Sequence, residues 1–559
     1  MKPLSFFALS SAVALAACGR SRSTAPVSTA PAPVRAETTA VTTPTPAAEA
    51  PAVRASALRE APRNWQLLDQ AADGIPGISA ERAMRELLAT KQPRRAVVVA
   101  IIDSGLDTAH VDLRDNIWRN PKETPANGKD DDGNGYADDV YGWNFIGGAD
   151  GRDVQWDTFE VTRLFVRCQK ADTLPAPERD RCGDVRRDFE KEKAEAQQLA
   201  GQVQMIGAAL DRAVQVLKRA VGTDSLTTER VSAYQPSGSE QAWAKNAYLQ
   251  LAEGGITPEE LADTRAAVET RVKYNLNASY DPRPIVGDRY ADPSERRYGN
   301  RDAMGPDAMH GTHVAGIVGA VRGNGVGVDG IAPSVRIMSV RTVPDGDERD
   351  KDVANAIRYA VDNGANVINM SFGKNYSPRK DVVDDAVRYA DAHGVLMVHG
   401  SGNDGEDVTR TPDFPTPTYV SGGGGRAQNW IDVGASSWKG GDSLAATFSN
   451  WGAGVDVFAP GVDILSTVPG GGYKRESGTS MAAPVVSGLA ALLMAYYPQL
   501  NAADVKRIIL ASAARHAAQQ VARPGDGTMV PFGSLSATGG IVNAYNAVRM
   551  AEEMTAVRP

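Results

Sequence analysis

The sequence predicts a doubly wound α/β fold with a mainly parallel sheet and an inserted helical subdomain. Continuous runs of β-branched and other apolar residues, typical of strands buried on both faces, occur at 96–102, 335–340, 365–370, 394–398 and 430–435. Helical patterns, such as those at 352–363 and 379–393, separate most of these runs. Strands that alternate with helices form parallel sheets, whose functional loops lie at the carboxyl ends of the strands.

The composition describes a soluble, mildly acidic globular chain. Its 559 residues are 42% hydrophobic and carry a formal net charge of −8, so no nucleic-acid partner is expected. No stretch beyond the N-terminus reaches the roughly 18 apolar residues that a membrane span needs. Nothing in the sequence indicates an oligomer, and a monomer is the default expectation.

The first residues resemble a bacterial export signal. Lys2 precedes a short apolar run, which predicts a signal peptide over residues 1–17. The run ends in Leu15-Ala16-Ala17-Cys18, which resembles the bacterial lipobox and implies lipidation of Cys18 and attachment to a membrane. With Gly19 next, the resemblance implies the outer membrane in a cell that has two membranes. The alternative is ordinary cleavage after Ala17.

Residues 18–62 are rich in alanine, proline and threonine and contain few large apolar residues. Such a segment cannot bury a core, so we predict a disordered tether that carries the lipid on Cys18. The main domain is predicted to start at residue 63 and to consist of residues 63–149 and 281–559.

The block between these two parts, residues 150–280, is rich in charges and poor in glycine. Apolar residues from Val185 to Val221 recur at steps of three and four, which predicts an amphipathic helix. Thr257 and Pro258 fit the cap and the first turn of another helix. We therefore predict a helical hairpin or small bundle inserted into the main domain.

Four polar residues mark a candidate active site. Asp103 ends the first predicted strand, His310 lies in the segment HGTHVAG, and Asn403 follows a buried strand. Ser480 lies in GTSMAAP, before an apolar run (485–497) typical of a buried helix. Free N–H groups at a helix N-terminus favour an anion, so this position suits a nucleophile whose own N–H helps to hold an oxyanion. The alternative is a simple helix-capping serine.

The order Asp, His, Ser on a parallel α/β sheet, with the segment around Asn403, resembles the subtilisin-like (S8) serine peptidases. The resemblance covers about residues 65–150 and 281–550. It implies that Ser480 is the nucleophile, that His310 is the general base oriented by Asp103, and that Asn403 donates its amide to the oxyanion. The predicted function is a serine endopeptidase that forms an acyl-enzyme and needs no cofactor for catalysis.

The segment that follows the strand at 365–370 resembles the substrate-binding segment of the family. Ser371, Phe372 and Gly373 would pair with an extended polypeptide substrate, as an added β-strand does. The alternative is an ordinary buried strand. At the level of the family, an apolar residue is expected before the cleaved bond.

A second candidate site is the acidic segment 130–139, with the sequence DDDGNGYADD. Carboxylate and amide oxygens at alternate positions, and a glycine at the sixth, resemble the start of an EF-hand-type calcium loop. The twelfth position is Tyr141 instead of glutamate. The candidate ligands of a structural calcium ion are therefore Asp130, Asp132, Asn134 and Asp138. The alternative is a solvated acidic turn.

Cys168 and Cys182 lie within the predicted insertion. In an oxidising compartment a disulfide between them would brace two helix ends, whereas two free thiols are the alternative. His313 lies three residues after His310 but lacks the spacing of the zinc-helix motif, so we predict a structural role for it.

Two other functions remain compatible with these patterns. One is a catalytically silent lipoprotein that binds peptides, and the other is a calcium-stabilised structural lipoprotein. Hydrolysis that depends on Ser480 would distinguish the endopeptidase from both.

Overall fold

The computed structural model describes residues 58–254, 256–420 and 422–556. The predicted signal peptide, Cys18 and nearly all of the predicted tether lie outside these residues. The described chain divides into a main unit, which comprises the residues up to Gln197 and from Glu269 onwards, and a helical unit, Gln198–Val268.

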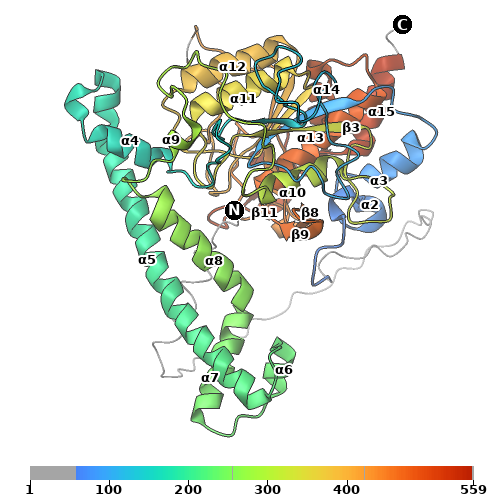
Figure 1. Cartoon of the computed structure of the whole chain (residues 1–559). Coiled ribbons are helices and arrows are strands. Elements are labelled where there is room, and N and C mark those ends of the chain that lie inside the picture. Colours follow the sequence, from blue (N-terminus) through green and yellow to red (C-terminus); the bar gives the residue numbers. More distant parts are fainter. Residues whose placement is uncertain (1–57, 255, 421, 557–559) are drawn as a thin grey trace, which may run out of the picture. The chain divides into compact units, whose positions relative to one another are not determined.

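The main unit is built on a nine-stranded sheet, and the predicted doubly wound, mainly parallel architecture is confirmed (Figure 1). β1 (Val97–Asp103) pairs in parallel with β3 (Val335–Arg341) on one side and with β4 (Val367–Met370) on the other. The chain thus winds outward from β1 in both directions, which is the arrangement that places functional loops at the carboxyl ends beside it. Beyond β3 lies β2 (Gly142–Asn144), and beyond β4 lie β5 (Leu396–Gly400), β6 (Trp430–Ser436), β7 (Val457–Pro460), β13 (Gly540–Ile541) and β10 (Ala514–Arg515).

Side chains along β1 alternate between two hydrophobic cores. Val97, Val99 and Ile101 belong to one core, whereas Ala100 and Ile102 belong to the other, and all are at most 2% exposed. Burial on both faces explains the unbroken apolar run in the sequence.

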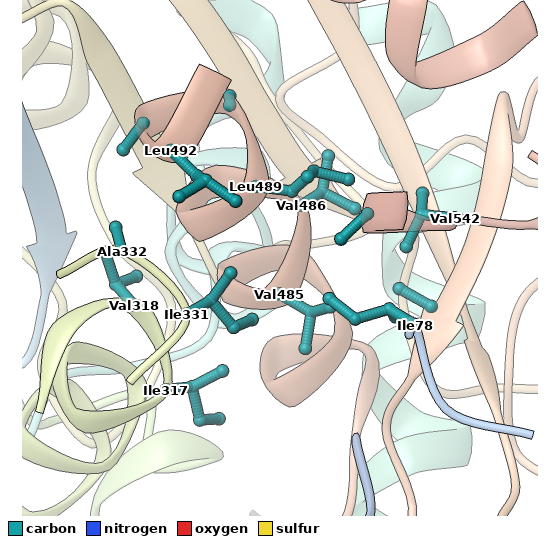
Figure 2. Close-up of a cluster of buried hydrophobic side chains, with 14 of the residues drawn as sticks. Ile78, Ile317, Val318, Ile331, Ala332, Val485, Val486, Leu489, Leu492 and Val542 are labelled. Carbon is teal, nitrogen blue, oxygen red and sulfur yellow. The ribbon is translucent and has the colours of Figure 1, made fainter. Parts of the chain in front are cut away.

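Helices cover both faces of the sheet. The second core is closed by α11 (Asp350–Asp362) and α12 (Lys380–Ala392), and the first by α10 (Met309–Gly319), α13 (Thr479–Tyr496), α14 (Ala502–Ala511) and α15 (Ala544–Ala556). Figure 2 shows α13 within the first core, with Val485 and Leu489 among the buried side chains. By length and composition α13 is apolar enough to cross a membrane, but 94% of it is buried in the fold.

The structure corrects one local prediction near the start of the main unit, where a short α3 (Ala80–Ala83) continues into a π-helical turn, Met84–Leu88. Ala61, which the sequence placed in the tether, is 5% exposed in the first core, and its carbonyl oxygen accepts a hydrogen bond from Arg475. The packed chain therefore begins before residue 63.

The predicted insertion is helical, but the structure divides it between the two units. α4 (Glu160–Cys168) and the first part of α5 (Ala176–Val221) belong to the main unit, where a disulfide joins Cys168 to Cys182. α4 and the first part of α5 share a hydrophobic core with Leu276, near the end of the predicted insertion. In this core Phe165 stacks on Phe189. Because of this packing, the compact helical unit is narrower than the predicted 150–280.

The helical unit contains the rest of α5, α6 (Thr228–Ala233), α7 (Ser239–Glu253) and most of α8 (Pro258–Thr270). It has a hydrophobic core of its own, to which each of these helices contributes apolar residues. The core includes Leu199, Val203, Leu210, Leu217, Val231, Ala244, Tyr248, Leu261 and Val268.

Candidate active site

The end of β1 and the start of α10 hold an aspartate–histidine pair. Asp103 is the last residue of β1 and His310 is the second residue of α10. The Nδ1 atom of His310 lies 2.8 Å from a carboxylate oxygen of Asp103, whose side chain is 2% exposed against 23% for the imidazole. Gly311 permits this approach, because a Cβ there would lie 2.1 Å from the carbonyl oxygen of Gly105.

Ser480 is the second residue of α13. Its hydroxyl donates to the carbonyl oxygen of Ser371 at 3.1 Å, and the Ser371 hydroxyl donates to the carbonyl oxygen of Ser480 at 2.9 Å. Pro484 explains the second bond, because a proline four residues on has no N–H to offer to the Ser480 carbonyl. The gap in the helical ladder thus ties the start of α13 to the end of β4.

A chain of buried polar groups continues from Ser371. The side chain of Asn369 donates to the Ser371 hydroxyl at 2.9 Å and accepts from Ser487 of α13 at 2.8 Å. All three residues are at most 4% exposed. Sequence reasoning selected Ser371 but missed Asn369 and Ser487, because their roles depend on contacts between β4 and α13.

Asn403 lies in the loop after β5, and Thr479 fixes the orientation of its amide. The side-chain oxygen of Asn403 accepts from the N–H of Thr479 at 2.9 Å and from its hydroxyl at 3.1 Å. Within the described residues, neither the NH2 group of Asn403 nor the N–H of Ser480 donates to a protein acceptor. The oxyanion of an acyl transfer requires two such unused donors.

Asn450, which the sequence did not single out, shapes the loop that carries Asn403. Its buried side chain accepts from the N–H groups of Asp404 and Glu406 at 3.0 and 2.9 Å, and it donates to the Ser401 carbonyl at 2.9 Å. The side-chain amide of Asn450 therefore fixes the conformation of the loop that carries Asn403.

The candidate substrate segment, Ser371, Phe372 and Gly373, follows β4 directly. His399 on β5 supports it: Nε2 lies 3.0 Å from the carbonyl oxygen of Phe372, and Nδ1 lies 3.0 Å from the carboxylate of Asp432. The imidazole is 1% exposed.

Lys374, the next residue, connects this segment to the base of the insertion. Its buried ammonium lies 2.8 Å from Asp350 on α11 and 3.2 Å from Glu160 on α4. Burial alone would raise the pKa of Glu160, but the charges of Arg163 and Lys374 hold it below its usual range. The end of the substrate segment is therefore fixed by charges from two helices.

His313 lies apart from this site. Its Nε2 lies 3.1 Å from the carbonyl oxygen of Ile464 and 3.0 Å from that of Lys474, which belong to the antiparallel strands β8 (Ile464–Val468) and β9 (Gly472–Glu476). Burial lowers the pKa of His313 to about 4, so the ring is neutral at pH 7. These contacts connect α10 to the β8–β9 hairpin.

The acidic loop assembles a ligand set that differs from the predicted one. Carboxylate oxygens of Glu123, Asp130 and Asp132 lie within 4.8 Å of one another, a spacing that fits a hard cation. Asp138 is not one of these three closely spaced carboxylates; its carboxylate accepts from the N–H groups of residues 127 and 128 and pairs with an arginine. Asn134 is engaged as well, with the N–H of residue 136 and with an aspartate. The sequence missed Glu123 because it lies outside the alternating pattern.

Comparison with known proteins identifies the family. A thermophilic serine proteinase from Bacillus sp. (strain AK1) is 40% identical over 240 residues, which cover 43% of this chain and 52% of that protein. Alkaline elastase YaB from Bacillus sp. (strain YaB) is 36% identical over 241 residues, covering 43% and 55%. Subtilisin BL from Lederbergia lenta is 37% identical over 199 residues, covering 35% and 67%. The chain thus spans about half the length of the first two relatives. The profile of the subtilase family matches residues 94–533, and the chain belongs to this family.

Proposed function

We propose that this protein is a serine endopeptidase that hydrolyses polypeptides through an acyl-enzyme intermediate. The observation that carries the proposal is the geometry at the carboxyl edge of the sheet. There the Asp103–His310 pair, the Ser480 hydroxyl and the unused donors of Asn403 and Ser480 come from four separate parts of the chain. Membership of the subtilase family supports the same reaction.

In the proposed reaction, an extended substrate pairs its backbone with Ser371 to Gly373. The Ser480 hydroxyl turns from the Ser371 carbonyl toward His310, which takes its proton as the oxygen attacks the peptide carbonyl. Asp103 orients the imidazole and stabilises the cation that forms. Collapse of the tetrahedral intermediate moves the proton from His310 to the leaving amine, and water then hydrolyses the acyl-enzyme by the same route.

A fluorophosphonate probe tests the reaction directly, because it esterifies only an activated serine. We expect the label on Ser480, located by peptide mapping and mass spectrometry. A folded protein that takes up no label and cleaves no peptide would instead support a silent peptide-binding or calcium-stabilised structural lipoprotein.

Replacement of Asn403 by leucine is expected to lower kcat about 10²–10³-fold and to change KM less than about threefold. That loss is the one found for the corresponding donor in subtilisin, a member of the same family. The reason is that the donor acts on charge that develops only in the transition state. Steady-state hydrolysis of a peptide measures both constants, with Glu406→Gln, an exposed position of the same loop, as the control. A loss confined to KM would contradict the role.

We also propose that the protein is exported and anchored to a membrane through a lipid on Cys18, a proposal that rests on the lipobox-like sequence. In a cell with two membranes the expected location is the outer membrane. Cys18→Ser should move the protein from the membrane fraction to the soluble fraction and leave peptide hydrolysis within about twofold. A wild-type chain that begins at Cys18 without a lipid mass would support ordinary signal cleavage.

The acidic loop supports a structural calcium ion held by Glu123, Asp130 and Asp132, with no part in the chemistry. Calcium at about ten times its Kd would stabilise the fold by about 1.4 kcal/mol and raise Tm by about 3–5 °C. Thermal unfolding with calcium and with a chelator measures this shift. Glu123→Gln should remove most of it, whereas Asp115→Asn, at an exposed carboxylate, should keep it. A wild-type Tm that calcium does not change would support a solvated acidic turn.

A further inference from the structure

Asp413 lies between the two segments that flank the proposed scissile bond. A Cβ on Gly373 would come within 2.2 Å of a carboxylate oxygen of Asp413, and one on Gly402 within 2.7 Å of the same oxygen. Gly373 ends the candidate substrate segment, and Gly402 precedes Asn403. The carboxylate therefore lies against both backbones, where neither glycine has a side chain to cover it.

The backbone fixes this position. Phe414, the residue after Asp413, exchanges two hydrogen bonds with Lys374, at 3.1 and 2.9 Å. Since Lys374 follows Gly373, the loop at Asp413 forms a short antiparallel pair with the end of the substrate segment. Asp413 cannot leave Gly373 without breaking this pair.

The Asp413 carboxylate has no counter-charge in the part of the chain that the structure describes, where it accepts no hydrogen bond and pairs with no cation. Burial, and then repulsion by Asp404 and Glu348, raises its pKa far above the usual range. Burial also raises the pKa of Asp404 and of Glu348, and one Glu348 oxygen is buried without a hydrogen-bond partner. The ammonium of Lys374 is held by Asp350 and Glu160. The carboxylate of Asp413 therefore lacks a cationic partner within the protein, and a cationic group on a ligand could take that place.

We infer that Asp413 selects substrates with arginine or lysine immediately before the cleaved bond. The inference rests on the proposed function. If Asn403 and Ser480 hold the attacked carbonyl and the substrate backbone pairs with the segment that ends at Gly373, the side chain next to that carbonyl enters between Gly373 and Gly402. It meets the Asp413 carboxylate there. This specificity differs from the apolar preference that the family resemblance implies.

The chemistry of a basic side chain fits this position. A guanidinium forms two parallel hydrogen bonds with one carboxylate, and an ammonium forms a compact ion pair. The incoming charge also favours the ionised form of Asp413, so that both partners are charged when the substrate is bound. An apolar side chain would instead cover the half-buried carboxylate and leave it unpaired.

A metal ion fits less well. Among the described residues, the acidic group with three ligand atoms within 4.8 Å of one another is that of Glu123, Asp130 and Asp132. Asp413 and its acidic neighbours do not converge in this way. A cationic side chain of a substrate can pair with a single carboxylate, whereas a metal ion needs several ligand atoms that point at one position.

The test compares kcat/KM of the full-length protein for four fluorogenic peptides that differ only in the residue before the cut: arginine, lysine, leucine and citrulline. Citrulline has nearly the shape of arginine without its charge. We expect arginine to exceed citrulline by about 100-fold, the scale of a buried charge left without its partner. Asp413→Asn should lower this ratio below about threefold, because a neutral amide neither pairs with arginine nor is left as an unpaired charge by citrulline or leucine. Glu406→Gln, an exposed carboxylate of the neighbouring loop, should keep the ratio.

A wild-type ratio of arginine to citrulline near one would overturn the inference, and so would an unchanged ratio in Asp413→Asn. The rate of fluorophosphonate labelling verifies that each variant is folded. Should Asp413→Asn not fold, Asp413→Ser replaces it, and the wild-type ratio remains an independent readout. If leucine peptides are cleaved without preference for arginine, this inference alone fails. If no peptide is cleaved and no probe reacts, the proposed function fails.

Discussion

Substitution of Ser480 by alanine is expected to lower kcat about 10⁶-fold, the loss found when the nucleophile of subtilisin is removed. Alanine lacks the oxygen that forms the acyl bond, so only direct attack of water remains, assisted by substrate binding and the oxyanion donors. KM should change little, because the candidate substrate segment at Ser371 to Gly373 is untouched. Initial rates of peptide hydrolysis over a wide range of enzyme concentration measure the loss.

The fold should survive this change. The Ser480 side chain makes one hydrogen bond, to the Ser371 carbonyl at 3.1 Å, and such a bond contributes about 1 kcal/mol to stability. Ser443→Ala, which removes an exposed hydroxyl, is the matched control and should retain full activity. Activity of Ser480→Ala above about 1% of wild type would contradict the proposed nucleophile.

Substitution of Asp103 by asparagine is expected to lower kcat about 10⁴-fold with KM within about threefold, as corresponding substitutions do in serine proteases. One carboxylate oxygen of Asp103 accepts from His310 at 2.8 Å and from the N–H of Ser104 at 2.7 Å, and the other is buried without a partner. A neutral amide cannot stabilise the imidazolium, and its NH2 group favours the wrong tautomer when it faces the ring.

The split between kcat and KM identifies the role of Asp103. A merely structural aspartate would reduce Tm and the fraction of active protein, without a uniform loss of kcat in the protein that remains folded. Asp115→Asn, at an exposed carboxylate, is the control and should stay within about twofold of wild type. A loss below about tenfold in Asp103→Asn would refute an orienting role for Asp103.

The strands of the central sheet could be predicted closely from the sequence. The run at 96–102 became β1, Val97–Asp103, and the run at 335–340 became β3, Val335–Arg341. Both are buried on two faces, so their apolar character is continuous and easily recognised. The short strands β2, β7, β10 and β13 of this sheet were missed, because two to four residues are too few for a clear periodicity.

The candidate ligands of the acidic loop were only partly predictable. Asp130 and Asp132 lie together as the alternating pattern indicates, but Asp138 has a left-handed backbone, with φ at 56°, and its carboxylate binds the N–H groups of residues 127 and 128. The place that the pattern gave to Asp138 is taken by Glu123, which precedes the loop. A single residue with left-handed backbone angles points its side chain in a different direction. The spacing of residues in the sequence does not predict such a conformation.

Local patterns of burial and the chemistry of single residues were enough to predict the fold class, the positions of the core strands and the placement of Ser480 at the start of an apolar helix. Which polar groups meet follows from the folding of the whole chain. Ser371 and Ser480 exchange hydrogen bonds across 109 residues, and His399 supports the substrate segment from a neighbouring strand. Asp413 likewise reaches Gly373 and Gly402 only through the folded loop. Such contacts depend on how segments that are far apart in the sequence pack together, and local sequence patterns do not predict this packing.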